Sequence, residues 1–261
     1  EVTGLRFHNR WVIYLLPVGG LLITYLYSIF KKEGKIDTNR VILSIREDQK
    51  IPLVMVPLIF ISTVITHFLG GSAGREGAAL QLGGGIATGV GKIFKLNRKE
   101  MHIITLSGMS ALFSALFGTP ITAAIFSLEV ICVGTMYYSA IIPTVIASLV
   151  AFYAATLFGV EPVRFALDVN IASEPLSFIK VGGLSVLIAL LSILFCLSMH
   201  MSHKKAQKLI KNPYIRGFVG GAVVIVLTLI FGTDYNGAGM NIAERAILEG
   251  KAEPFAFLLK L

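Results

Sequence analysis

An adjacent arginine and glutamate in a glycine-rich turn are the residues of this chain whose types and spacing could carry chemistry. They lie in the run Gly70-Gly71-Ser72-Ala73-Gly74-Arg75-Glu76-Gly77, between two long apolar segments. An ionised side chain at bilayer depth is costly unless it has a partner or lines a water-filled path. The pair therefore indicates a site for ion transport.

The segment after this turn predicts a helix that starts near Ala78. The first amides of a helix have no partner within it, and the helix dipole makes that end attractive to anions. The carboxylate of Glu76 can fold back onto these amides, and protonation would neutralise it and release it. A proton and a small anion would then compete for one location, which predicts a gate and an exchange mechanism. Alternatively, Arg75 and Glu76 only cap the helix at the lipid interface.

The composition is that of an integral membrane protein. The chain is 55% hydrophobic and 15% charged, and its mean hydropathy is +0.78, which is too apolar for a soluble domain of 261 residues. Several apolar runs approach the roughly 20 residues that a spanning helix needs. They cover residues 11–30, 51–70, 103–117, 138–159, 175–199 and 217–232. We expect an all-α, multi-pass protein in the lipid bilayer, with residues 1–261 forming a single transmembrane domain.

The net charge of +8 does not indicate nucleic-acid binding, because the basic residues gather in short loops between apolar runs. Basic loops at residues 92–99 and 204–216 are expected on the cytoplasmic side, and the acidic loop at 161–174 outside. This orientation predicts that the glycine-rich turn lies toward the outer half of the membrane, where the chain reverses.

A second interruption is predicted where residues 103–117 and 121–135 meet at Phe117-Gly118-Thr119-Pro120. Proline lacks an amide donor and usually begins or ends a helix. Irregular backbone at membrane depth is tolerated only where protein or a water-lined cavity satisfies its polar groups. Interrupted helices whose N-terminal ends point at an anion form the ion sites of transporters. Two such interruptions are therefore expected.

These motifs together resemble the CLC family of chloride channels and anion/proton antiporters. The resemblance covers approximately residues 51–160 and is carried by Gly74-Arg75-Glu76-Gly77, Gln81-Leu82-Gly83-Gly84, and Gly118-Thr119-Pro120 leading to Glu129. It implies a CLC-type fold with interrupted helices, and an inverted repeat whose second half is incomplete in this chain. It also implies a homodimer with one pathway per protomer, and Glu76 as the gate and proton acceptor.

The chain departs from the family at two anion motifs. Ala78 stands where the family has Pro, and the stretch corresponding to the Gly-Ser-Gly-Ile-Pro motif is Gly34-Lys35-Ile36-Asp37-Thr38-Asn39. Thr38 or Asn39 could replace the missing Ser, or both belong to a solvated cytoplasmic loop. With these departures, the chain resembles the bacterial fluoride/proton antiporter branch of the family. The resemblance thus implies a protein of the bacterial plasma (inner) membrane that prefers fluoride, with a chloride channel or chloride/proton antiporter as the alternative.

The resemblance implies an anion site formed by Gly74, Arg75, Gly77 and Ala78, with Pro120 and Glu129 in secondary roles. Many antiporters of the family have a second glutamate after the one that matches Glu129, and this chain has Val130 there. Fluoride-branch members resemble it in lacking that internal glutamate. Glu129 is then either a structural, hydrogen-bonded acid or a substitute proton path.

Two other classes of function stay open from the residues alone. Gly70-x-Ser72-x-Gly74 matches the nucleophile elbow of hydrolases, which needs a preceding strand and nearby His and acid partners. An apolar helix is predicted there instead, and His67 is the only obvious base. We therefore expect no enzyme, with a membrane hydrolase using Ser72 as a minor alternative and a non-transporting interaction subunit as another. We expect no cofactor and no metal.

Overall fold

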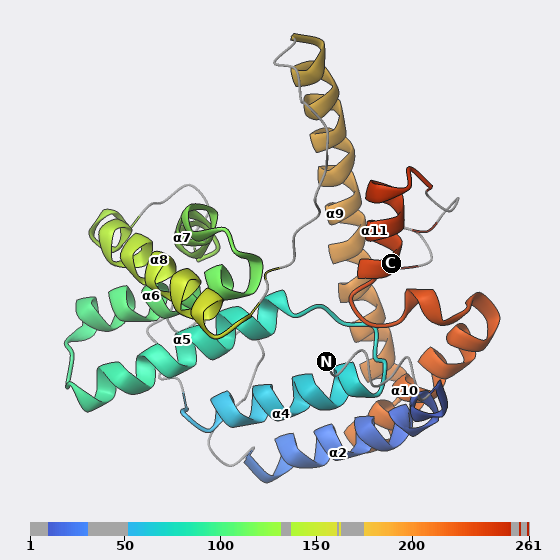
Figure 1. The fold of residues 1–261 in the computed structure, drawn as a ribbon. Coiled ribbons are helices and arrows are strands. Elements are labelled where there is room, and N and C mark those ends of the chain that lie inside the picture. Colours follow the sequence, from blue (N-terminus) through green and yellow to red (C-terminus); the bar gives the residue numbers. More distant parts are fainter. Residues whose placement is uncertain are drawn as a thin grey trace.

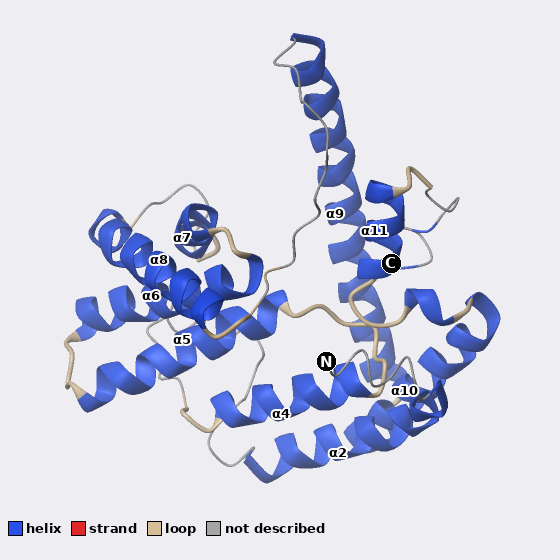
Figure 2. Ribbon diagram, viewed as in Figure 1, coloured by secondary structure: helices blue, strands red, loops and turns tan. Residues whose placement is uncertain are grey.

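The computed structural model describes residues 10–30, 52–131, 137–160, 162, 175–251, 256 and 260, and every element assigned in these ranges is helical (Figures 1 and 2). The order is η1 (Arg10–Leu15), α2 (Leu16–Ile29), α4 (Met55–Phe68), α5 (Glu76–Ile93), α6 (Arg98–Phe117), α7 (Pro120–Glu129), η3 (Tyr138–Ala140), α8 (Ile141–Leu157), α9 (Pro175–Leu209), α10 (Pro213–Phe231), η4 (Thr233–Tyr235) and α11 (Met240–Leu248). The expected all-α class is confirmed.

Five helical segments of the described chain are long and apolar enough to cross a membrane. They are Trp11–Ile29, Arg98–Phe117, Tyr138–Leu157, Leu176–Leu209 and Pro213–Phe231. The helices α4 and α7 are apolar but shorter. Helix α6, whose apolar run 103–117 predicted a short segment, is instead long enough to cross a membrane. The multi-span architecture inferred from the apolar runs is confirmed.

The helices form two groups, with α9 extending away from both (Figure 1). One group contains α5, α6, α7 and α8, in which α6 packs against each of the other three. The other contains α2, α4 and α10, in which α2 packs against both neighbours. Because α4 also packs against α5, the glycine-rich turn lies where the chain passes from one group to the other.

Helix α5 is held against α6 by close backbone contact. A Cβ built on Gly83 would overlap the carbonyl of Gly108, and one built on Gly108 would overlap the Gly83 carbonyl and the Ala87 side chain. Small residues allow this approach in membrane proteins, where packing and interhelical hydrogen bonds replace the hydrophobic effect. The hydroxyls of Thr88 and Thr105 add a buried hydrogen bond of 3.0 Å between the two helices.

Helix α6 is joined to α8 by two buried hydroxyls. Ser110 donates to the Thr144 carbonyl at 3.1 Å, and Ser114 donates to the Ser148 carbonyl at 2.8 Å. Both serines are fully buried. Next to them, Met109 belongs to a hydrophobic core contributed by α4, α5, α6 and α7. These contacts make α6 the central support of the helix that carries Glu76.

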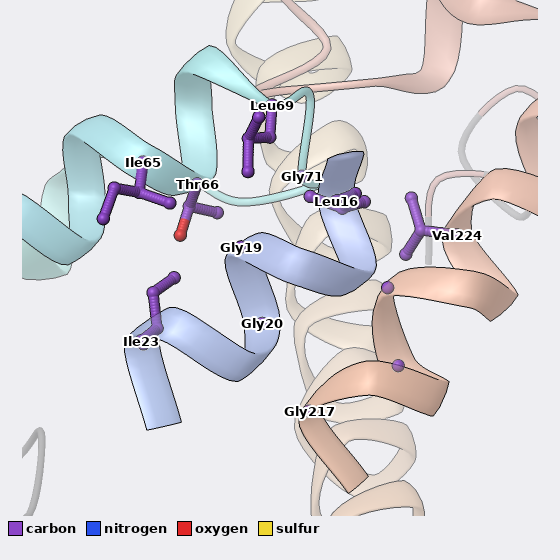
Figure 3. Close-up of a pocket in the computed structure, with 12 residues that line it drawn as sticks. Leu16, Gly19, Gly20, Ile23, Ile65, Thr66, Leu69, Gly71, Gly217 and Val224 are labelled. Atoms are coloured by element: carbon purple, nitrogen blue, oxygen red, sulfur yellow. The ribbon is translucent and has the colours of Figure 1, made fainter. Parts of the chain in front are cut away.

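A cavity of about 170 Å³ lies between α2, α4 and α10 (Figure 3). Its wall is apolar, and it includes Gly71 of the glycine-rich turn beside Leu16 and Leu69. Glycines line much of the remainder because α2 and α10 approach closely: a Cβ on Gly20 would overlap the carbonyl of Gly217. The cavity carries no charged side chain, so it is a packing space adjoining the turn.

Candidate functional site

The glycine-rich turn begins with a helix-ending motif at α4. Gly70 has a φ of 86°, and its amide donates to the His67 carbonyl at 3.3 Å. The Gly71 amide donates to the Thr66 carbonyl at 2.8 Å. This pair of bonds is the Schellman arrangement, in which a left-handed glycine reverses the chain and satisfies the last carbonyls. Gly70 therefore fixes the direction in which the chain leaves α4.

Helix α5 begins at Glu76 without a side-chain cap. Its N-cap residue is Arg75, whose side chain makes no capping hydrogen bond, and the first helical bond runs from the Ala79 amide to the Arg75 carbonyl at 2.9 Å. Helix α6, in contrast, starts with a capping box between Asn97 and Glu100. The amides at the start of α5 are therefore the type of donor that a helix offers to an anion.

The carboxyl group of Glu76 is folded back toward the preceding turn. A Cβ placed on Gly74 would overlap Oε2 of Glu76, so the carboxyl occupies the space next to the Gly74 backbone. At Gly77 the space is open, since no atom lies within 4 Å of the position that a Cβ would take there. The absence of a side chain at residue 74 thus allows the glutamate to take this conformation.

The residues predicted to hold the anion form a continuous but open surface. Gly74, Arg75, Glu76 and Gly77 are exposed, and Ala78 is half-buried. The structure therefore places the Glu76 carboxyl beside Gly74 at the start of α5, but within the described chain it does not enclose these residues in a pocket. Thr38 and Asn39 lie outside the described residues.

The second predicted interruption is present between α6 and α7. Gly118 ends α6 with a φ of 67°, Thr119 precedes α7, and Pro120 occupies its first turn. Pro is favoured at this position because its missing amide proton has no helical partner to lose. The helices that begin after the two breaks, α5 and α7, both pack against α6.

Glu129 is the last residue of α7 and is half-buried. It is followed by Val130 as the C-cap residue. The sequence raised two alternatives for Glu129, a buried structural acid and a proton path, and a half-buried side chain is compatible with both.

Ser72 does not have the surroundings of a hydrolase nucleophile. Its hydroxyl accepts a hydrogen bond from Nζ of Lys260 at 2.8 Å, and Nδ1 of His67 is bonded to the Thr63 carbonyl at 2.9 Å. The same ammonium also donates to the carbonyls of Tyr235 and Gly237. A lysine nitrogen that donates to three acceptors has no lone pair left to accept a proton, so Lys260 cannot serve as a general base for Ser72.

Lys260 is the residue near the turn that the sequence analysis missed. A signal was available, because Lys260 stands between Leu259 and Leu261 in an apolar stretch, where a lysine needs a polar partner. Its partners could not be foreseen, since Ser72 is 188 residues away in the chain. Within the described ranges, no group of three or more metal-ligating side chains occurs.

Comparison with known proteins identifies a family that this chain matches and three similar proteins. The family described as voltage gated chloride channel matches residues 19–261. A chloride/fluoride channel protein of Pseudomonas syringae pv. tomato is 34% identical over 236 residues, which make up 90% of this chain and 52% of the relative. An uncharacterized protein of Methanocaldococcus jannaschii is 26% identical, over 97% of this chain and 63% of its own.

A solved structure is also similar throughout the described fold. It is the crystal structure of a CLC-type fluoride/proton antiporter, with a TM-score of 0.90 and 29% sequence identity. The match covers 99% of this chain and 66% of that one. The chain therefore spans about half to two thirds of the length of the proteins it matches.

Proposed function

Because this chain belongs to the voltage-gated chloride channel family, we propose that its full-length protein exchanges a small halide for protons across the membrane. Fluoride is the preferred anion, and Glu76 is the gate and proton acceptor. Residues 1–261 contribute to a single transmembrane domain, which works as a homodimer in the plasma membrane of a bacterium.

One observation carries the proposal: the Glu76 carboxyl is folded back beside Gly74, at a helix start that has no side-chain cap. The uncapped amides at this helix start are donors for which an ionised carboxylate and a halide would compete, since both are anions. Protonation removes the charge of the carboxylate and therefore its preference for the helix end. Proton binding and anion binding then alternate at one place.

The neighbouring residues have supporting roles in this proposal. The backbone of Gly74, Gly77 and Ala78 provides the close approach and the amides. The exposed guanidinium of Arg75 attracts anions to the site. Thr38, Asn39, Pro120 and Glu129 remain candidates for the inner anion contact, the second helix end and a proton path.

The preference for fluoride is supported by two relatives. One is described as a chloride/fluoride channel protein and the other as a fluoride/proton antiporter. Val130 at the position of the second family glutamate agrees with that branch. Chloride/proton exchange or a chloride channel is the alternative.

The test is ion efflux from liposomes that contain the full-length protein, with fluoride, chloride and proton movements recorded together. Wild type is expected to move fluoride faster than chloride and to move protons in the opposite direction. Glu76→Gln keeps the size of the side chain but removes its charge and its proton exchange, so proton movement should fall to background. Equal fluoride and chloride rates would contradict the preference, and proton-coupled flux in the Gln variant would contradict the role of Glu76.

A further inference from the structure

A bridge of three hydrogen bonds joins the glycine-rich turn to a distant turn between α10 and α11. Nζ of Lys260 donates to Oγ of Ser72 and to the Tyr235 carbonyl, both at 2.8 Å, and to the Gly237 carbonyl. A lysine ammonium has three donors, so these acceptors use its full capacity. Bonds from a charged donor are roughly twice as strong as neutral ones. We call these three contacts the Lys260 bridge.

The far side of the bridge is braced independently of Lys260. Thr228 of α10 donates to the Asn236 side chain at 2.9 Å, and Arg245 of α11 pairs with Asp234 at 2.6 Å. Gly239 has a φ of 77°, and a Cβ there would lie 3.1 Å from the Lys260 side chain. The 233–239 turn is therefore fixed at both ends and fits closely around the lysine stem.

The near side of the bridge is the turn that carries the gate. Ser72 lies between the Schellman end of α4 and the start of α5, four positions before Glu76. Ser72 itself is exposed, and the bond from Lys260 attaches its side chain to the braced turn. Lys260 thus attaches the segment that precedes Glu76 to the 233–239 turn.

We propose that Lys260 is a positioning residue that holds the glycine-rich turn in the conformation in which Glu76 folds back beside Gly74. This inference rests on the proposed gating role of Glu76. Without the ammonium, Ser72 is released, the turn samples other conformations, and the carboxyl spends less time beside Gly74. Anions then pass without a matching proton.

Hydrogen exchange of the full-length protein in detergent tests the bridge itself. Lys260→Met should accelerate amide exchange in residues 70–77 and 233–239 on the order of tenfold, as expected for the loss of charge-assisted bonds at a local opening. Exchange in α6 should not change, which separates this effect from general unfolding. Lys260→Arg should restore most of the protection, because it retains a cationic donor.

Transport tests the consequence for the gate in the same variants. Lys260→Met should raise the number of fluoride ions moved per proton severalfold, and Lys260→Arg should return the ratio toward that of wild type. Lys251→Met is the matched control, because the Lys251 side chain is 83% exposed and its ion pair with Glu249 is loose, with Nζ 3.9 Å from Oε2. This variant should leave the fluoride-to-proton ratio unchanged.

Two results would overturn the inference. One is a Lys260→Met protein whose amide exchange in residues 70–77 and 233–239 equals that of wild type. The other is a Lys260→Met protein with faster amide exchange in these turns but an unaltered fluoride-to-proton ratio. If the wild-type protein itself moves fluoride without protons, the proposed function fails instead, and the exchange comparison still decides whether Lys260 joins the turns.

Discussion

The carboxyl of Glu76 occupies the position that a side chain at Gly74 would need. The backbone of Gly74 does not have a positive φ, so its lack of a side chain matters for space rather than for conformation. This relationship makes residue 74 the most direct place to disturb the proposed gate without changing its charge.

Gly74→Ala is expected to displace the Glu76 carboxyl, because the added methyl group overlaps Oε2. Fluoride flux should persist while the accompanying proton flux falls severalfold, measured in liposomes with both ions recorded. Gly182→Ala on α9 is the control, since nothing lies within 4 Å of a Cβ there. Unaltered coupling in the Gly74→Ala variant would show that the folded-back carboxyl is not the gating conformation.

Ala78→Pro should leave the fold intact, because the first helical bond of α5 begins at the Ala79 amide. The change deletes one free amide, so fluoride affinity should weaken by about fivefold if that amide contributes about 1 kcal/mol. Thermal unfolding measures the stability of the variant, and fluoride calorimetry on the same preparation measures its affinity, so the two quantities are determined separately.

Ala79→Pro provides the contrast for this substitution. It removes the bond to the Arg75 carbonyl and should cost about 3 kcal/mol in the free energy of unfolding. Equal stability losses at positions 78 and 79 would mean that α5 starts elsewhere.

Gly108→Ala should destabilise the α5–α6 contact, because its methyl group overlaps the Gly83 carbonyl and the Ala87 side chain. Overpacking of this kind costs about 1–3 kcal/mol. The loss should appear as a lower unfolding temperature in detergent, and Gly183→Ala, with open space around it, should not reproduce it. A Gly108→Ala protein as stable as wild type would contradict the close approach of the two helices.

Ser114→Ala should lower stability by about 1 kcal/mol, because it removes a buried bond from α6 to α8. Ser107→Ala is the matched comparison, since that hydroxyl bonds to the Ile103 carbonyl of its own helix. Unfolding in denaturant should place Ser107→Ala much closer to wild type; indistinguishable variants would argue against the interhelical bond.

The sequence predicted the helices from hydropathy, and therefore located their lipid-crossing parts better than their ends. The apolar run at 175–199 continues as helix to Leu209, because its polar continuation has no breaker before Asn212 and Pro213. The run at 103–117 begins at Arg98, where Asn97 and Glu100 form a capping box that hydropathy ignores.

The site was predictable to the extent that its residues are neighbours in the chain. Gly70, Gly118 and Pro120 act through local backbone rules, so the two interruptions followed from residue types. The exposure of Glu76 and the bond from Lys260 to Ser72 depend on which distant segments pack beside the turn. Local patterns carry no information about such contacts.

The 35 residues of α9 correspond to a length of about 52 Å, well beyond a hydrocarbon layer of about 30 Å. Its final turns contain Lys204, Lys205 and Lys208, so this end of the helix belongs in water. A fluorophore or surface anchor attached there would stand clear of the proposed gate and report the orientation of each reconstituted molecule.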